Sequence, residues 1–385
     1  MNILCINHEY PPVGGGASSV ARELLGRFYK NGHSVTLLTE SVPENTRCVE
    51  EPEFPVFRIH AGRKSVSRGS YLEFILFFFK AAGKLREINR LHRADITLAF
   101  FTFPGGLLAL VQKWWYGTPY ILSIRGGDIP GFVVDKKLAF FHLLSSPLIK
   151  LICKKADLVH TNSGRLEELA LKLIPDLFIK VIPNGAVFRE HQFFEKTDNE
   201  MLKIIFVGRL SKQKNLNTFL LGLSMLPEDI KRKSVFTILG EGPEKDNLIK
   251  MVKTHGLSGI VQFQGWMGRE NLRKKYESHT FSVLPSIDEG MPNAALESIA
   301  SGCPVLGSRY GSLSWEDDRL KKFWIVENER DGRAWKDRIV ELYRRRNEIG
   351  EDFRLMREYA ERNFNWDIII HDYENMLQSI CGVAK

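Results

Sequence analysis

The feature that most constrains this chain is a regular alternation of short apolar runs with longer helical patterns. An apolar run over residues 2–7 leads into the glycine turn Gly14-Gly-Gly16, a helical pattern over 17–29 and a β-rich run over 34–39. That order is a βαβ unit, which places two strands in parallel within one sheet. Similar runs, each ending at turn-forming residues, follow at 96–101, 120–124, 158–161 and 179–182. This pattern predicts a doubly wound domain.

The same alternation restarts after 189–201, a polar stretch without clear periodicity that we interpret as a linker. Expected helices separate strands expected at 203–207, 234–239, 261–264, 281–285 and 304–308. We therefore expect an α/β fold with two Rossmann-like domains of similar size. Such sheets bind ligands at the carboxyl ends of their strands, so a cleft between two facing domains is the expected ligand site.

Composition narrows the class of protein. The chain has 385 residues, 44% of them hydrophobic and 26% charged, which excludes a mainly disordered, collagen-like or disulfide-built chain. Five cysteines without CxxC spacing favour a reducing cytoplasm over a disulfide frame or a zinc site. The first residues carry no basic segment before their apolar run, so we expect no signal peptide and a cytoplasmic location.

The positive charge is concentrated in the first half of the chain. Residues 1–190 hold 24 Lys and Arg against 17 Asp and Glu, whereas the remainder holds 30 against 29. This asymmetry is typical of a chain that binds a polyanion, a phosphorylated ligand or an anionic membrane. A net charge that only keeps the protein soluble would also explain it. The apolar stretch 71–79 is too short to span a bilayer. A buried core helix is the favoured interpretation of it, and an interfacial helix is the alternative.

Two carboxylates frame the most specific pattern, Glu289-Gly-Met-Pro-Asn-Ala-Ala-Leu-Glu297. Glu289 follows an expected strand, and Pro292 and Asn293 begin the next helix, where free N–H groups attract phosphate. Gly290 allows close approach of a ligand. Glu297 lies about one turn into the helix, where its carboxylate can accept hydrogen bonds from sugar hydroxyls. Two helix-favouring glutamates near a positive dipole end would produce the same spacing.

A basic loop and a glycine turn are the other two candidates. In Val207-Gly-Arg-Leu-Ser-Lys-Gln-Lys-Asn215, Arg209 and Lys214 follow a strand and can neutralise a diphosphate, although a solvated loop remains open. The glycine turn precedes a helix N-terminus, which is an anion cradle. As a dinucleotide fingerprint it lacks the third glycine. Glu40 could stand in for the acidic ribose ligand of such a fingerprint.

Together these segments resemble the GT4 family of retaining glycosyltransferases, which have the GT-B fold and use nucleotide-sugar donors. The resemblance covers nearly the whole chain. It rests on Tyr10-Pro-Pro-Val-Gly-Gly-Gly16, Gly32-His-Ser-Val-Thr39, Ala156-Asp-Leu-Val-His-Thr-Asn-Ser163, Val181-Ile-Pro-Asn-Gly185, Val207-Gly-Arg209, Leu239-Gly-Glu-Gly-Pro243, Val261-Gln-Phe-Gln-Gly265 and the Glu289–Glu297 pair.

The resemblance implies a domain plan. Residues 1–188 would form an acceptor-side Rossmann-like domain, 189–201 a linker, and 202–365 the nucleotide-sugar donor domain. Residues 366–385 would form a C-terminal helix that packs back on the first domain. The two domains would face a cleft.

The resemblance also implies roles for individual residues. Arg209 and Lys214 would hold the donor diphosphate, and Glu297 the ribose. Glu289, with the backbone of the turn after it, would hold the donor sugar and phosphates. Further donor contacts would come from Gly15, Gly16, Gly265, Trp266, Met267, Gly290, Met291, Pro292 and Asn293. With Arg125, the residues Glu289, Arg209 and Lys214 form the candidate catalytic set.

The chain departs from the family pattern at several positions. In Ser123-Ile-Arg-Gly-Gly-Asp128, Arg125 stands where the family often has His, and a guanidinium cannot act as a near-neutral acid or base. Arg125 could instead stabilise phosphate charge or bind an anionic acceptor group. Asn184-Gly185 lacks the Asp that often follows in the family, and Met291 bears on sugar choice. We assign Arg125, Asp128 and His8 to the acceptor side, although His8 has the alternative of a satisfied loop histidine.

The resulting hypothesis is a retaining hexosyltransferase that needs neither a metal nor a cofactor, with the nucleotide-diphosphate sugar as co-substrate. The sequence contains no Asp-x-Asp, HExxH or Gly-x-Ser-x-Gly pattern. The acceptor would be a glycan or lipid-linked saccharide in bacterial surface polysaccharide, capsule or O-antigen synthesis. A nucleotide-sugar 2-epimerase, a non-catalytic nucleotide-sugar-binding protein and a nicotinamide oxidoreductase are the alternatives.

The uneven charge then fits a peripheral position on the cytoplasmic face of a membrane, and it argues against nucleic acid as a partner. The first half is rich in basic and aromatic residues that suit an anionic membrane or a lipid-diphosphate acceptor. They are Arg63, Lys64, Arg68, Phe77–Phe79, Lys80, Lys84 and Trp114-Trp115.

Overall fold

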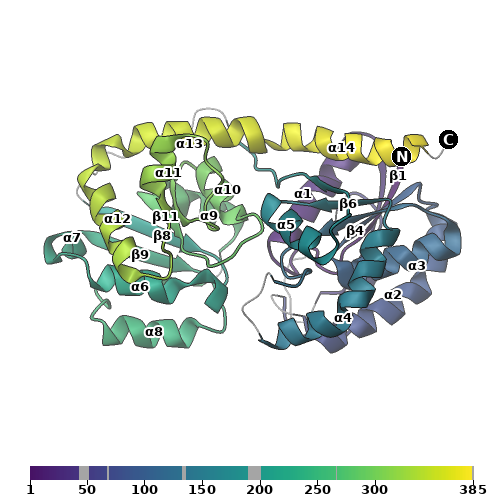
Figure 1. Ribbon diagram of the computed structural model, residues 1–385, viewed down its shortest axis with the longest axis horizontal. Helices are drawn as coiled ribbons and strands as arrows, with labels where there is room; N and C mark the ends of the chain where they lie inside the picture. Colours follow the sequence, from purple (N-terminus) through teal and green to yellow (C-terminus); the bar gives the residue numbers. More distant parts are fainter. Residues whose placement is uncertain (43–51, 67–68, 132–135, 190–200, 266, 384–385) are drawn as a thin grey trace. The chain divides into compact units, whose positions relative to one another are not determined.

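The computed structural model describes residues 1–42, 52–66, 69–131, 136–189, 201–265 and 267–383, with the backbone alone described at 136–143, 269 and 383. Most of the expected linker, residues 190–200, and Trp266 therefore lie outside the described residues. The chain divides into two compact units, which we call unit 1 (Met1–Asn184 and Asp367–Lys385) and unit 2 (Gly185–Trp366) (Figure 1).

Unit 1 is built on a parallel seven-stranded sheet in the order β3-β2-β1-β4-β5-β6-β7. Its strands are β1 (Asn2–Ile6), β2 (Ser34–Glu40), β3 (Val56–Ile59), β4 (Ile96–Phe100), β5 (Tyr120–Ile124), β6 (Leu158–Thr161) and β7 (Ile179–Val181). Its helices are α1 (Gly16–Lys30), α2 (Tyr71–Leu91), the π-helical turn η1 (Thr102–Gly106), α3 (Leu107–Tyr116), α4 (Lys136–Lys155), α5 (Gly164–Leu173) and α14 (Trp366–Val383).

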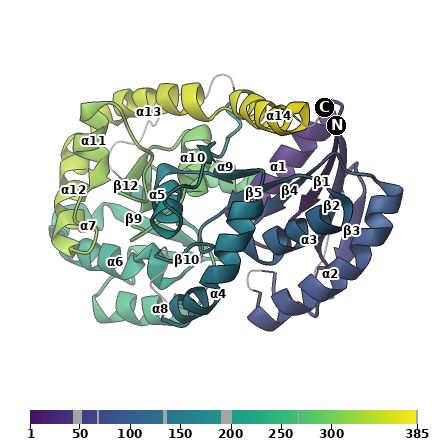
Figure 2. The same cartoon turned by 45° about the vertical axis from the view of Figure 1, so that its right-hand side comes forward.

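Helices cover both faces of the sheet of unit 1. Figures 1 and 2 show α2, α3 and α4 together on one face and α1 beside α14 on the other. The C-terminal helix α14 is held on this unit by Glu374, whose carboxylate accepts from Asn31 at 2.8 Å, and by Tyr373, which lies against Phe28. The return of the last helix to the first domain, which the resemblance implies, is therefore present.

Unit 2 is built on a parallel six-stranded sheet in the order β10-β9-β8-β11-β12-β13. Its strands are β8 (Leu202–Val207), β9 (Ser234–Leu239), β10 (Val261–Gln264), β11 (Phe281–Leu284), β12 (Val305–Ser308) and β13 (Ile325–Val326). Its helices are η2 (Lys212–Lys214), α6 (Leu216–Ser224), α7 (Glu228–Arg232), α8 (Lys245–Thr254), α9 (Arg269–Glu277), α10 (Asn293–Ala300), α11 (Asp318–Trp324), α12 (Gly332–Arg344), η3 (Arg346–Glu348) and α13 (Ile349–Phe364).

The doubly wound α/β class expected from the sequence is confirmed in both units. Among the described elements, six short ones were not predicted, namely β3, η1, η2, α7, α11 and β13. The ends of unit 2 are tied together by a parallel bridge between Ala186 and Asn365, and Gly185 packs against the ring of Trp366 so closely that a Cβ there would lie 2.5 Å from it.

The apolar stretch at the start of α2 is only partly buried. Phe77 is fully buried, but Leu72 and Phe79 expose 66% and 67% of their surface. The favoured interpretation of 71–79 as a core helix is therefore wrong for one face of it. Arg63 is also not the surface cation that the sequence indicated, because its side chain is 1% exposed and pairs with Glu40 at 2.7 Å. Arg68 lies outside the described residues.

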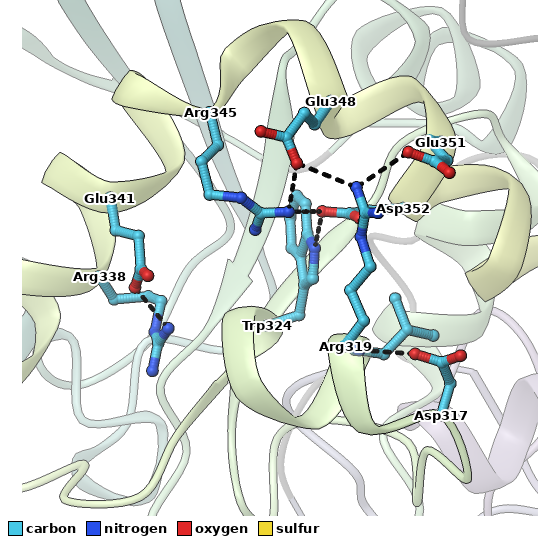
Figure 3. A network of polar contacts seen from close by, with 10 residues as sticks. Asp317, Arg319, Trp324, Arg338, Glu341, Arg345, Glu348, Glu351 and Asp352 are labelled. Atoms are coloured by element: carbon cyan, nitrogen blue, oxygen red, sulfur yellow. Dashed lines mark hydrogen bonds and ion pairs between the residues drawn. The ribbon is translucent and has the colours of Figure 1, made fainter.

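A buried carboxylate joins three helices of unit 2. Asp352 of α13, whose side chain is 1% exposed, accepts from Arg319 at 2.5 Å and from the indole of Trp324 at 2.9 Å, and lies 3.6 Å from Arg345 (Figure 3). Glu351 contacts the same Arg319 at 3.0 Å but is 53% exposed. The network fixes α11 and the end of α12 against α13.

Asp352→Ala and Glu351→Ala form a matched pair for this network. Removing Asp352 leaves the donors of Arg319 and Trp324 without their acceptor, so we expect a loss of about 2–4 kcal/mol in the free energy of unfolding. Removing Glu351 breaks only an exposed ion pair and should cost less than about 1 kcal/mol. Urea unfolding of both variants measures the difference, and equal losses would contradict this account of the network.

One imidazole of unit 1 lies within an aromatic cluster. The ring of His8 is 3% exposed and lies 4.8 Å from the rings of both Phe74 and Phe101. Burial, together with the charge of Arg63, lowers the pKa of His8 to about 3. The folded chain therefore keeps this ring neutral at pH values where the unfolded chain protonates it.

His8→Phe keeps the aromatic packing and removes this titration. Since the pKa of His8 is depressed in the folded state, its contribution to stability is present above about pH 6.5 and is lost as the pH falls toward 3. Between pH 7 and pH 5 we expect the wild type to lose about 2 kcal/mol more unfolding free energy than His8→Phe. Urea unfolding at the two pH values measures this, and parallel losses would show that His8 is not held neutral.

Candidate functional site

The candidate donor site begins at the point in unit 2 where the strand order reverses. The chain leaves β8 toward β9 on one side, whereas β11 lies on the other side of β8. The loops that follow β8 and β11 therefore leave the carboxyl edge of the sheet toward opposite sides, and doubly wound sheets bind ligands at such a point. The first loop carries Arg209 and Lys214, and the second carries Glu289.

An ion pair connects these two loops. Lys214 donates to Glu289 through a short contact, with the two side chains 20% and 13% exposed. Gln213 reinforces the connection, because its side chain donates to the carbonyl of Asp288 at 2.6 Å and its own carbonyl accepts from Ile287 at 2.9 Å. The structure thus brings together two residues that lie 75 positions apart and that the sequence assigned to one ligand.

Asn215 closes the basic loop after Lys214. It adopts φ 53, in the left-handed region that asparagine tolerates, and thereby ends η2 and starts α6. Its side chain donates to the carbonyl of Glu329 at 2.7 Å and accepts from Thr218 at 2.7 Å. These bonds fix the direction in which Lys214 leaves the turn.

Glycines allow the loop after β9 to pack closely against the basic loop. A Cβ at Gly240 would lie 1.9 Å from the carbonyl oxygen of Gly208, and one at Gly242 would lie 2.2 Å from that of Leu210. The backbones also bond directly, since Leu210 donates to Glu241 at 3.0 Å. The glycines of Leu239-Gly-Glu-Gly-Pro243 therefore allow close backbone contact. Arg209 is exposed on the loop that they support.

The start of α10 completes the polar side of the site. Gly290, Met291 and Asn293 are half-buried and Pro292, the residue before the helix, is buried. The first backbone N–H groups of an α-helix have no partners within the helix, and the dipole adds positive potential there. This end of α10 follows Glu289 directly, so the backbone amides predicted to bind an anion lie on the same loop as the carboxylate that pairs with Lys214.

Glu297 and Met267 both lie near Tyr276 of α9. Tyr276 packs in a small cluster with Met267, and its hydroxyl donates to the carbonyl of Ala294 at 3.4 Å. Burial and the nearby carboxylate of Glu297 raise the pKa of Tyr276 well above its usual value. Glu297 is exposed on α10, and Gly265 is exposed at the end of β10. The residue predicted for the ribose, Glu297, and one predicted donor contact, Met267, thus both lie near Tyr276.

The candidates of unit 1 lie at the carboxyl edge of its sheet. Gly15 and Gly16, which were predicted to contact the donor, are exposed at the start of α1, and no atom lies within 4 Å of a Cβ placed on Gly15. Gly14, with φ +95, could not carry a side chain without striking Glu9. His8, Arg125 and Asp128 occupy the ends of β1 and β5, but they are 3%, 3% and 7% exposed.

Arg125 joins distant parts of unit 1. Its guanidinium donates to Asn184 at 2.8 Å and to the hydroxyl of Tyr373 in α14 at 3.2 Å, and it lies over the ring of Phe100. Its backbone N–H donates to Asp128 at 2.9 Å. In this structure Arg125 is an internal anchor between β5, the end of the first segment of unit 1 and the C-terminal helix. Its catalytic and acceptor-side roles stay predictions.

Asp128 ties the loop after β5 to the loop after β4. Its carboxylate accepts from the backbone and hydroxyl of Thr102 at 3.2 and 3.4 Å. Burial raises the pKa of Asp128 to about 7, against the opposing effect of these bonds and of Arg125. The buried imidazole of His160 bonds Ser123 at 2.9 Å and Tyr373 at 3.2 Å.

Glu40 is not available to a nucleotide ribose. It is fully buried and its carboxylate pairs with Arg63. The interpretation of Glu40 as an acidic ribose ligand is therefore wrong, because a long-range ion pair uses that group. Gln213 is a positioning residue that the sequence did not reveal, since an amide in a polar loop forms no recognisable pattern. Within the described ranges, His, Cys, Asp and Glu side chains form no group of three or more that could hold a metal ion.

Comparisons with known proteins match both units. The family model described as glycosyl transferases group 1 matches residues 187–362, and the one described as glycosyltransferase family 4 matches residues 14–187. A relative in Campylobacter jejuni, named as an N-acetylgalactosaminyltransferase that acts on an N-acetylgalactosamine-N,N'-diacetylbacillosaminyl-diphospho-undecaprenol, is 30% identical over 72% of this chain and 75% of its own length.

Solved structures share the fold along the whole chain. Sucrose-phosphate synthase from Thermosynechococcus elongatus has a TM-score of 0.85 at 19% identity and covers 99% of both chains. The HepE protein of Anabaena, solved with UDP-glucose, has a TM-score of 0.73 at 14% identity and covers 98% of this chain and 99% of its own. The fold, the two family matches and the Campylobacter relative agree. The chain belongs to the GT4-type glycosyltransferases with the GT-B fold.

Proposed function

We propose that this glycosyltransferase takes a sugar from a nucleotide-diphosphate sugar held by unit 2 and transfers it, with retention of the anomeric configuration, to a glycan or lipid-linked saccharide held by unit 1. The observation that carries the proposal is the Lys214–Glu289 pair at the reversal of strand order, beside the start of α10. The printed name of the Campylobacter relative supports a diphosphate-linked lipid acceptor, and the UDP-glucose complex of HepE supports the donor class.

The chemistry follows from where charge develops. When the bond from the anomeric carbon to the diphosphate oxygen breaks, negative charge grows on the leaving phosphate. Lys214, Arg209 and the amides at the start of α10 stabilise that charge without having to reorganise. Glu289 accepts hydrogen bonds from sugar hydroxyls, and Glu297 accepts from the ribose. The acceptor oxygen attacks from the face that the phosphate leaves, and the leaving phosphate oxygen takes its proton, so no protein nucleophile is needed.

The positive groups of the protein supply the charge that a divalent metal would otherwise provide, so metal independence is part of the proposal. We further propose that the enzyme works at the cytoplasmic face of a bacterial membrane in surface polysaccharide, capsule or O-antigen assembly. The residues that frame the donor sugar, Glu289 and Met291, are the candidates for sugar choice.

A donor screen tests the proposed function. We expect one class of nucleotide-diphosphate sugar to raise the melting temperature and, with an undecaprenyl-diphosphate saccharide in EDTA, to yield a product whose new linkage keeps the anomeric configuration of the donor. NMR of the product reads that configuration. An inverted linkage, an absolute need for added Mg²⁺ or Mn²⁺, or conversion of the donor alone into a new nucleotide sugar would contradict the proposal.

Lys214→Ala and Lys212→Ala form a matched pair of variants, because both lysines belong to η2 and only Lys214 is assigned to the donor. Comparing them distinguishes a specific role of Lys214 from a general effect of positive charge in the loop. Loss of Lys214 removes a cation aimed at the leaving phosphate, so kcat/KM should fall at least about tenfold, or about 1.4 kcal/mol. Glu297→Ala should lower kcat/KM at least as much, because the carboxylate that accepts a hydrogen bond from the ribose is lost. Lys212, which is exposed, should change kcat/KM less than about twofold. Equal effects of the two lysine variants would sink the assignment.

A further inference from the structure

Exposed apolar side chains are concentrated in unit 1. Of the large hydrophobic residues that are exposed in the described chain, fifteen lie in unit 1 and two, Val187 and Met225, lie in unit 2. Five of the fifteen belong to the first nine residues of α2. The two units are similar in size, so this asymmetry is not an effect of surface area.

The five residues occupy one side of the helix. Tyr71, Leu72, Ile75, Leu76 and Phe79 recur at spacings of one, three and four residues, which places them on the side opposite the buried Phe77, Ala81, Leu85 and Ile88. We call them the α2 apolar face. Leu72 and Phe79 expose 66% and 67% of their surface, and the other three expose 39–43%.

The charged residues of the helices on this side of the sheet of unit 1 are mostly basic. The described side chains of α2, α3 and α4 include eight Lys and Arg and two Glu. They are Lys80, Lys84, Arg86, Arg90, Lys113, Lys150, Lys154 and Lys155, against Glu73 and Glu87. On the opposite layer of the same sheet, the described residues of α1 and α14 balance in charge (Figure 2). They are Arg22, Arg27 and Lys30 against Glu23, Asp367, Asp372 and Glu374. Unit 1 therefore has a basic, apolar layer and a nearly neutral one.

This combination fits a lipid surface better than a protein partner. Apolar and aromatic side chains with Lys and Arg beside them are typical of helices that lie in the headgroup region of an anionic bilayer. Trp114 and Trp115, exposed at the end of α3, have the amphipathic rings that such interfaces favour. Among the described helices, none has the length and apolarity to cross a bilayer, so α2 would lie along the surface.

We propose that the α2 apolar face inserts into the headgroup region of an anionic lipid bilayer, with the exposed Arg86 and Arg90, which continue the same side of the helix, against lipid phosphates. The proposal goes beyond the proposed sugar transfer and does not depend on it. Phe74 of α2 lies 4.8 Å from His8, and the carbonyl of Val66 accepts from Gly14 at 2.7 Å. Insertion of α2 therefore brings the carboxyl edge of the unit 1 sheet close to the lipid phosphates, where a saccharide joined to a lipid by a diphosphate presents its sugar.

Sedimentation with lipid vesicles tests the proposal on the full chain, with no donor or acceptor present. We compare vesicles of phosphatidylcholine with vesicles that also contain phosphatidylglycerol. The wild type should bind the anionic vesicles and release on addition of salt. Leu72→Ser/Phe79→Ser should weaken binding at least about tenfold, because two large apolar side chains no longer leave water.

Phe178→Ser is the matched control, because Phe178 is 76% exposed in unit 1 outside the α2 apolar face. Its vesicle binding should equal that of the wild type, and all variants should keep the wild-type melting temperature. Equal binding by the double variant and the wild type, or binding that ignores both anionic lipid and salt, would overturn the proposal.

Two further measurements distinguish lipid insertion from dimerisation and from a failure of the acceptor assignment. If the α2 apolar face instead joins two copies of the chain, sedimentation velocity will show a dimer that the double variant dissolves, without vesicle binding, and that result overturns lipid insertion. Transfer to a water-soluble acceptor analogue should be unchanged in the double variant, whereas transfer to acceptor in anionic vesicles should fall. Loss of both activities with intact vesicle binding would count against the assignment of unit 1 to the acceptor.

Discussion

The proposed chemistry of this protein depends on the reversal of strand order between β8 and β11. Since every strand of unit 2 is parallel, both strands end at the same edge of the sheet, but their loops turn in opposite directions. The contact between Lys214 and Glu289 connects the two loops, and Gln213 adds hydrogen bonds to the backbone of the loop after β11. A cation, a carboxylate and the start of α10 are thus placed together by topology rather than by closeness in sequence.

The rest of unit 2 supports that arrangement. Gly240 and Gly242 allow the loop after β9 to pack against the carbonyls of the basic loop, and Asn215 turns the chain into α6. Asp352 fixes α11 against α13. Unit 1 uses its buried charges differently. Its buried cations form contacts within the unit. Arg63 pairs with Glu40, and Arg125 donates to Asn184 and Tyr373.

The sequence predicted the fold well wherever local pattern and burial agree. The strands β9 and β10 lie at the predicted residues, because each is a short apolar or alternating run with a clear turn at its end. The elements β3 and β13 were missed because two to four residues carry no period, and α11 was missed because seven residues make a weak helical signal. The family pattern singled out Lys214 and Glu289, which the structure brings into contact. No local sequence pattern predicts that Glu40 pairs with Arg63 or that half of the apolar stretch in α2 is exposed, because both depend on tertiary packing.

The central claim is that a nucleotide diphosphate binds at the reversal point of unit 2. Hydrogen–deuterium exchange of the whole chain, with and without a panel of nucleoside diphosphates, tests it most directly because it locates binding without requiring the acceptor. The account predicts slower exchange at residues 208–215 and 290–297 with at least one nucleotide, and little change at the glycine turn of unit 1. Protection confined to that glycine turn, or no protection by any nucleoside diphosphate, would contradict it.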